Sequence, residues 1–146
     1  MELKVLIILH VLSAATWIGS LLITTLGVLP KAMKQRNPQL LVDFENNFKI
    51  LQMIALTLQF LTGFRMAMKY APISQWFATD NAHSYYIQLK LMLLLITILT
   101  YVFNRIFVVK KASEANLNQY AIHLILLTFT SVLLAIVGLS FRLNII

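Results

Sequence analysis

Four long runs of apolar residues, separated by short polar segments, dominate the chain. The first run is unbroken from Val5 to Leu29, and the second is free of charge from Ile50 to Phe64. A helix rises about 1.5 Å per residue, so about 20 residues cross the hydrocarbon core of a bilayer. We therefore predict an all-α fold, an integral membrane four-helix bundle that forms a single domain over residues 1–146. The predicted spans lie at about 3–29, 44–70, 85–109 and 117–141.

Polar residues and proline set the predicted ends of the spans. Pro30 and the basic residues after it are expected to stop the first helix. Lys49 and Arg65 flank the charge-free part of the second span, so we expect their side chains to extend toward water. Trp76, in the loop 71–84, is a residue type that favours the membrane interface. The first apolar run exceeds the usual core of a signal peptide, so we expect it to be retained as a helix.

The distribution of charge predicts an orientation. Four spans place both chain ends and the loop 71–84 on one side of the membrane. Basic residues outnumber acidic ones on the opposite side, which the positive-inside rule makes cytoplasmic. We therefore expect both termini on the outer, periplasmic side of a bacterial inner membrane. The residues assigned to the cytoplasmic side are Lys31, Lys34, Arg36, Lys49, Arg105, Lys110 and Lys111, together with Asp43, Glu45 and Glu114.

Composition agrees with a membrane protein and narrows its chemistry. Of the 146 residues 60% are hydrophobic and 12% are charged, and the mean hydropathy is +0.81, outside the range of soluble domains. The net charge of +7 comes from residues near the ends of the apolar runs, which lipid headgroups explain without a nucleic-acid partner. The absence of cysteine excludes disulfides, iron–sulfur clusters and covalent c-type haem. A metal or cofactor would need His, Met, Lys, Tyr or oxygen ligands.

Each predicted helix carries polar or small residues at helical spacing. Lipid offers such residues no partner, so we expect them to face the bundle interior. Threonine, serine and glycine in these stripes are typical of ordinary helix packing. The stripes consist of His10, Ser13, Ala14, Trp17 and Thr24; Gln52, Gln59, Gly63 and Met66; Lys90, Thr97, Tyr101 and Asn104; and His123, Thr130 and Gly138.

His10 is the only ionisable residue in the first apolar run. An ionisable group at that depth costs a few kcal/mol unless it faces a partner, water or a metal. We expect Lys90 to lie at a similar depth, because the first and third spans both begin on the outer side of the membrane. His83 precedes Lys90 by seven residues on the same helical face, and Met66 and Met68 end the second span at this outer side.

Two kinds of centre fit this outer cluster. Copper could be held by His10 with Met66 or Met68, with or without His83. Haem could be held by His10 with a methionine, with Lys90, or with His83 as a second imidazole. A neutral His10 hydrogen-bonded to a hydroxyl or carbonyl group is the purely structural alternative.

Other candidates are weaker. His123 lies early in a helix that starts on the cytoplasmic side, so we do not expect it to pair with His10. We predict no carboxylate within the spans, which argues against a carboxylate-based ion-coupled transporter.

Three segments carry a family resemblance: LHVLSAATWIGSLL, LTGFRMA and LKLMLLLITILTYVFNR. In this order they resemble the copper-resistance D (CopD) superfamily of bacterial membrane proteins over most of residues 5–110. The resemblance implies a four-helix membrane domain associated with copper handling. The positions that match its motifs are His10, Trp17, Gly19, Gly63, Lys90, Asn104 and Arg105. We expect a supporting polar face made of Trp17, Gln59, Gly63, Asn104 and Arg105.

The chain is also similar to the HemJ-type protoporphyrinogen oxidases, small four-helix proteins with a histidine early in the first helix and a lysine early in the third. His10 and Lys90 match these positions, which implies haem b. The leading functional expectation is a CopD-like protein that binds copper near the outer face, for transport or delivery. The alternative is a haem-b redox protein acting on a porphyrinogen, a quinone or a small oxidant. The third is an accessory subunit of a larger membrane complex. We expect the chain to assemble either as a homo-oligomer or in such a complex.

Overall fold

The computed structural model describes residues 1–78 and 82–143, without the side chains of 82, 83 and 141–143. The first helical span has three parts: α1 (Glu2–Ile23), the π-helical segment η1 (Thr24–Val28) and α2 (Leu29–Gln35). It ends at Arg36, whose φ of 50° is left-handed and stops the helix.

The other spans follow through short turns. α3 (Gln39–Tyr70) is one uninterrupted helix, and the short 3₁₀ turn η2 (Ile73–Gln75) lies in the loop after it. The third span consists of α4 (Ala82–Phe103), the π-helical η3 (Asn104–Val108) and the 3₁₀ turn η4 (Val109–Lys111). The last consists of the 3₁₀ turn η5 (Glu114–Asn116) and α5 (Leu117–Leu143).

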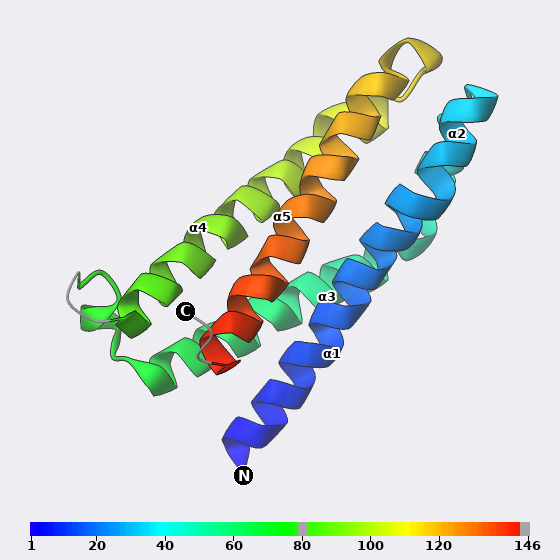
Figure 1. Cartoon of the computed structure of the whole chain (residues 1–146). Coiled ribbons are helices and arrows are strands. Elements are labelled where there is room, and N and C mark those ends of the chain that lie inside the picture. The colour runs from blue at the N-terminus through cyan, green and yellow to red at the C-terminus, as the bar shows by residue number, and fades with distance from the viewer. Residues whose placement is uncertain (79–81, 144–146) are drawn as a thin grey trace.

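The four spans run up and down along one another (Figure 1). α1 packs mainly on α3, and α4 packs mainly on α5. The start of α1 and the end of α5 lie at the same end of the molecule, together with the loop between α3 and α4 (Figure 1). We call this the terminal end, and we call the opposite end, with Arg36 and Lys111, the turn end. The prediction of an all-α chain with four long apolar helices is confirmed.

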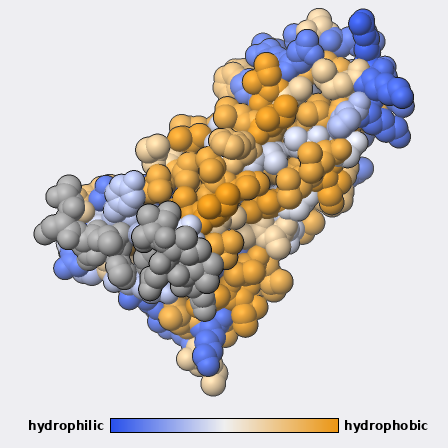
Figure 2. Space-filling model, viewed as in Figure 1, coloured by the Kyte–Doolittle hydropathy of each residue, from blue (hydrophilic) through white to orange (hydrophobic). Residues whose placement is uncertain are grey.

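The surface has the make-up of a multi-pass membrane protein. Hydrophobic side chains cover the middle of the visible face, and hydrophilic ones gather at the turn end, at the upper right of Figure 2. Large apolar side chains such as Leu26, Ile50 and Phe129 are more than half exposed in the absence of lipid. Each of the four spans is long and apolar enough to cross a bilayer.

The prediction that Pro30 ends the first helix is wrong. Pro30 lies in the first turn of α2, and the helix continues to Gln35. Proline lacks an N–H and its ring clashes with the carbonyl of the preceding turn. The π-helical segment η1 directly before it widens that turn, and the Leu29 N–H bonds back to the Thr24 carbonyl. The chain thus accommodates the proline without ending the helix.

The core contains buried aromatic and leucine side chains together with buried residues of the polar stripes. Trp17 is 4% exposed, contacts Tyr101 edge to face at 5.2 Å between ring centroids, and donates its indole N–H to Ser131 Oγ at 2.9 Å. The predicted inward orientation is confirmed for the stripe members that are buried: Ser13, Trp17, Thr24, Gln52, Thr97, Tyr101, Asn104 and Thr130.

Trp76 differs from the expected interfacial residue. It is 4% exposed and packs with Ala71 and Ile87 in a small cluster beneath the loop. The Trp76 indole N–H donates to the Ala71 carbonyl at 2.9 Å. The Gln88 side-chain amide donates to the backbone carbonyl of Trp76 at 3.0 Å. The loop therefore folds back over α4, which removes the tryptophan from the surface.

Candidate functional site

The imidazole of His10 is held in one protonation form by Thr62 of α3. His10 Nδ1 lies 2.8 Å from Thr62 Oγ1. The threonine hydroxyl has a single proton, and it donates this proton to the Leu58 carbonyl at 2.5 Å. With that proton donated to Leu58, Thr62 accepts from His10, which assigns the ring proton to Nδ1. The lone pair of Nε2 remains available for a ligand.

Close packing fixes the position of the His10 ring. A Cβ atom added at Gly63 would lie 3.1 Å from His10 Cε1, so only glycine lets the ring approach α3 this closely. Gln59 donates its side-chain amide to the His10 carbonyl at 3.1 Å, and Ser13 donates to the same carbonyl at 3.0 Å. Both the backbone and the ring of His10 are thus tied to α3.

Lys90 approaches the same region from α4. It is half-buried, and its amine lies within electrostatic range of His10. A Cβ added at Gly138 of α5 would lie 3.3 Å from Lys90 Nζ, so a second glycine accommodates this side chain. Among the described residues, no carboxylate pairs with Lys90. Lys90 of the third span thus lies between the His10 region and Gly138 of the fourth span.

The ligands expected to join His10 at a copper site are Met66, Met68 and His83. Met68 packs against the Trp76 cluster, and Met66 is half-buried on α3. The side chain of His83 lies outside the described residues, so its role stays a prediction. Within residues 1–78 and 82–143, no three His, Cys, Asp or Glu side chains form a metal-ligand group.

His123 contacts an aromatic residue of the third span. The His123 ring packs against the ring of Phe103 with a centroid distance of 5.2 Å. Phe103 is the residue directly before η3 on the third span. Phe103 also borders a shallow groove of about 260 Å³ at the turn end, lined with Phe107 and Lys111 among others.

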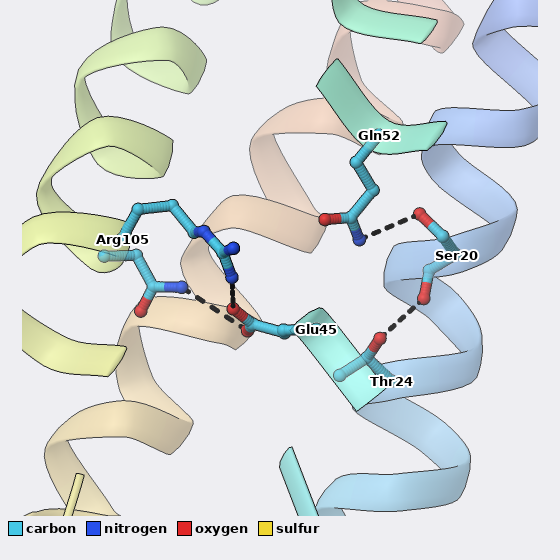
Figure 3. Close-up of polar contacts among 6 residues, drawn as sticks. Ser20, Thr24, Glu45, Gln52 and Arg105 are labelled. Carbon is cyan, nitrogen blue, oxygen red and sulfur yellow. Dashed lines mark hydrogen bonds and ion pairs between the residues drawn. The ribbon is translucent and has the colours of Figure 1, made fainter. Parts of the chain in front are cut away.

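A second polar cluster, which the sequence analysis missed, lies toward the turn end. Glu45 of α3 is 3% exposed, and its Oε2 accepts from Arg105 Nη1 at 3.1 Å. Its Oε1 lies 3.5 Å from Asn104 Nδ2. Figure 3 shows Arg105 reaching across to Glu45, with Gln52 and Thr24 both bonded to Ser20 on the neighbouring helix.

This cluster corrects two predictions. A carboxylate does lie within a helical span, because α3 begins at Gln39 and carries Glu45 into the bundle. Asn104 and Arg105 pair with this carboxylate, which assigns them to the second cluster instead of the His10 environment. The signal was present in the sequence as a seven-residue spacing that runs from Glu45 through Gln52 to Gln59.

Comparisons with known proteins give no further identification. No protein-family model, no curated protein and no solved structure matches the chain. The functional argument therefore depends on the geometry of the two clusters.

Proposed function

We propose that the chain is a haem-b-binding membrane redox protein in which His10 would hold the haem iron through Nε2. The observation that carries the proposal is the hydrogen bond between His10 Nδ1 and Thr62, whose own proton is committed to Leu58. Histidines that ligate metals characteristically donate their other ring N–H to a fixed acceptor, which sets the tautomer and orients the ring.

The residues around His10 suit a haem in their chemistry. Imidazole is a common axial ligand, and Lys90 supplies either a second nitrogen ligand or a positive charge for a propionate. Gly63 and Gly138 let α3 and α5 approach these two side chains closely, since an added Cβ would lie 3.1 Å from His10 Cε1 and 3.3 Å from Lys90 Nζ. Bound in this place, haem iron would supply one-electron transfer within the bilayer.

A nitrogen-donor centre has more support than copper. Cu(I) favours thioether ligands, and the methionine that the structure places in a defined contact, Met68, packs on the Trp76 cluster. By contrast, Lys90 is brought into electrostatic range of His10. The similarity to HemJ-type oxidases makes a porphyrinogen the substrate class of this proposal.

A visible absorption spectrum of the freshly purified protein, combined with elemental analysis, tests the proposal. Protein from haem-replete cells is expected to show a Soret band that shifts on reduction, with iron in stoichiometric amount. A colourless protein that contains copper would overturn the haem proposal and favour the CopD-like function. A colourless protein without metal would leave the accessory-subunit function as the better account.

A further inference from the structure

The Glu45 carboxylate is buried with incomplete pairing. Only one guanidinium nitrogen of Arg105 contacts it, at 3.1 Å, instead of the two that a bidentate pair provides. Its other oxygen meets Asn104 Nδ2 at 3.5 Å, the outer limit of a hydrogen bond. A buried charge usually has its remaining lone pairs satisfied, so this site leaves hydrogen-bonding capacity unused.

Three further polar atoms around this carboxylate are buried without a partner among the described residues. They are the Tyr101 hydroxyl, the Tyr120 hydroxyl and Asn104 Oδ1. Tyr120, which is 1% exposed, lies beside the Glu45 carboxylate, and Tyr101 interacts electrostatically with both Glu45 and Arg105. Unpaired buried polar atoms are costly and rare, and their concentration in one place gives the site the capacity to bind a small polar ligand.

The chemistry of the cluster selects a small neutral ligand. Glu45 and Arg105 cancel each other's charge, so the site does not favour a bare cation or anion. The unpaired groups include two hydroxyls and one amide oxygen, which together require both a donor and an acceptor. Water meets these requirements, because it bonds to several buried polar groups at once.

The site lies near the turn end. Glu45 lies six residues after the start of α3, about 9 Å along the helix axis. The Arg105 side chain is 14% exposed and links the carboxylate to the surface. Asn104 is the first residue of the π-helical segment η3, and such segments frequently mark functional sites.

We propose that Glu45 is a proton-binding site of the membrane bundle, supplied through ordered internal water from the turn end. A proton from the bulk solvent at the turn end passes along this water, which is itself reprotonated, and forms an O–H bond on the Glu45 carboxylate, which loses its charge and its ion pair with Arg105. The guanidinium keeps its charge and bonds to water at the surface. The proposal stands independently of haem binding, since it depends on a different cluster.

The charged and titratable groups that face Glu45 come from two spans. Arg105 and Tyr101 belong to the third span, and Tyr120 belongs to the fourth. The first span faces the cluster with uncharged groups such as Thr24, which is fully buried. The neighbouring charges on α3 itself, Asp43 and Lys49, are exposed. Glu45 is therefore the group that we expect to bind the proton.

Infrared difference spectroscopy of the full chain in lipid nanodiscs tests this proposal. On acidification, the carbonyl-stretch band of a protonated carboxylic acid is expected to grow reversibly and to shift promptly in D₂O. The band should be absent from Glu45→Gln. It should persist in Asp43→Asn, which removes an exposed carboxylate from the same helix.

A second variant keeps the test decisive if Glu45→Gln does not fold. Tyr120→Phe retains the carboxylate and the ion pair, and the band should move to higher wavenumber because the hydroxyl beside the carboxylate, which the proposed water would bridge to it, is lost. A wild-type spectrum without such a band, or a band that stays unshifted in D₂O or in Tyr120→Phe, would overturn the proposal. The same measurement on haem-free protein separates this outcome from the outcome for haem.

Discussion

At the scale of single residues, the chemistry of His10 depends on one neighbouring hydroxyl. The Thr62 hydroxyl donates its hydrogen bond to the backbone of its own helix and presents only a lone pair to the imidazole. The ring therefore keeps its proton on Nδ1, and Nε2 is the unprotonated nitrogen that could bind a metal. Few side chains could replace Thr62, since a carboxylate would add charge and an alkyl group would leave Nδ1–H unpaired.

Thr62→Val tests this dependence, because valine has the shape of threonine without the hydroxyl. We expect the variant to bind haem about 10–100-fold more weakly, the usual effect of removing such an outer hydrogen bond. Titration of the haem-free protein with haem measures the change. Thr57→Val is the matched control, since Thr57 is exposed on the same helix and bonds only to the Met53 carbonyl. Equal affinity of the two variants would contradict the assigned tautomer.

Gly63→Ala tests the packing of the ring. The new Cβ would lie 3.1 Å from His10 Cε1, so the ring or α3 must move. We expect a loss of about 1–3 kcal/mol in the free energy of unfolding. Gly19→Ala is the control, because nothing lies within 4 Å of its added Cβ and alanine favours the helix by about 1 kcal/mol. Unfolding by denaturant in mixed micelles compares them, and a neutral Gly63→Ala would show that the ring is not tightly held.

Sequence reasoning found His10 because a lone ionisable group in an apolar run is conspicuous, and it found Lys90 by depth. It did not find Thr62, since a threonine in an apolar helix looks the same whether it packs or binds an imidazole. It missed Glu45 because the second span was expected to begin near Phe44, with the carboxylate at the interface. Only the pairing with Arg105, 60 residues away in the chain, reveals the buried position.

At the scale of elements, two π-helical segments shape the first and third spans. η1 begins at Thr24 and η3 begins at Asn104, and both of these residues are buried. Each segment shifts the helical face of the residues that follow it by inserting an extra residue into a turn. Hydropathy and spacing predicted the spans themselves, but periodicity alone does not indicate where a turn widens.

Hydrogen bonds between elements should contribute more to stability than those within one helix. Ser131→Ala leaves the buried indole N–H of Trp17 without its partner on α5, and we expect a cost of about 1–3 kcal/mol. Ser13→Ala removes a hydroxyl that bonds only within α1, so we expect a cost below about 1 kcal/mol. Denaturant unfolding monitored by tryptophan fluorescence measures both. A reversed order would mean that the Trp17 contact does not join the two helices.

At the scale of the whole molecule, the exposed charges are unequal between the two ends. Glu2 bridges Arg65 at 3.2 Å and Lys69 at 2.9 Å, which offsets positive charge at the terminal end. At the turn end Glu45 offsets Arg105, and the exposed basic residues left over are Lys31, Lys34, Arg36, Lys49, Lys110 and Lys111. By the positive-inside rule the turn end is expected in the cytoplasm.

Cysteine labelling tests this orientation directly, because the natural chain contains no cysteine. In intact bacterial cells, a membrane-impermeant maleimide should label Gln75→Cys, in the exposed loop at the terminal end. It should label Ala115→Cys, exposed at the turn end, only after the cells are opened. The opposite pattern would invert the predicted topology.

The haem content of two purified histidine variants tests the central claim, that His10 is the haem ligand, most directly. His10→Ala removes the imidazole bonded to Thr62, whereas His123→Ala removes one that packs on Phe103 in another part of the bundle. We predict that His10→Ala loses the Soret band while His123→Ala keeps the wild-type amount of haem. An unchanged haem content in folded His10→Ala would contradict the account.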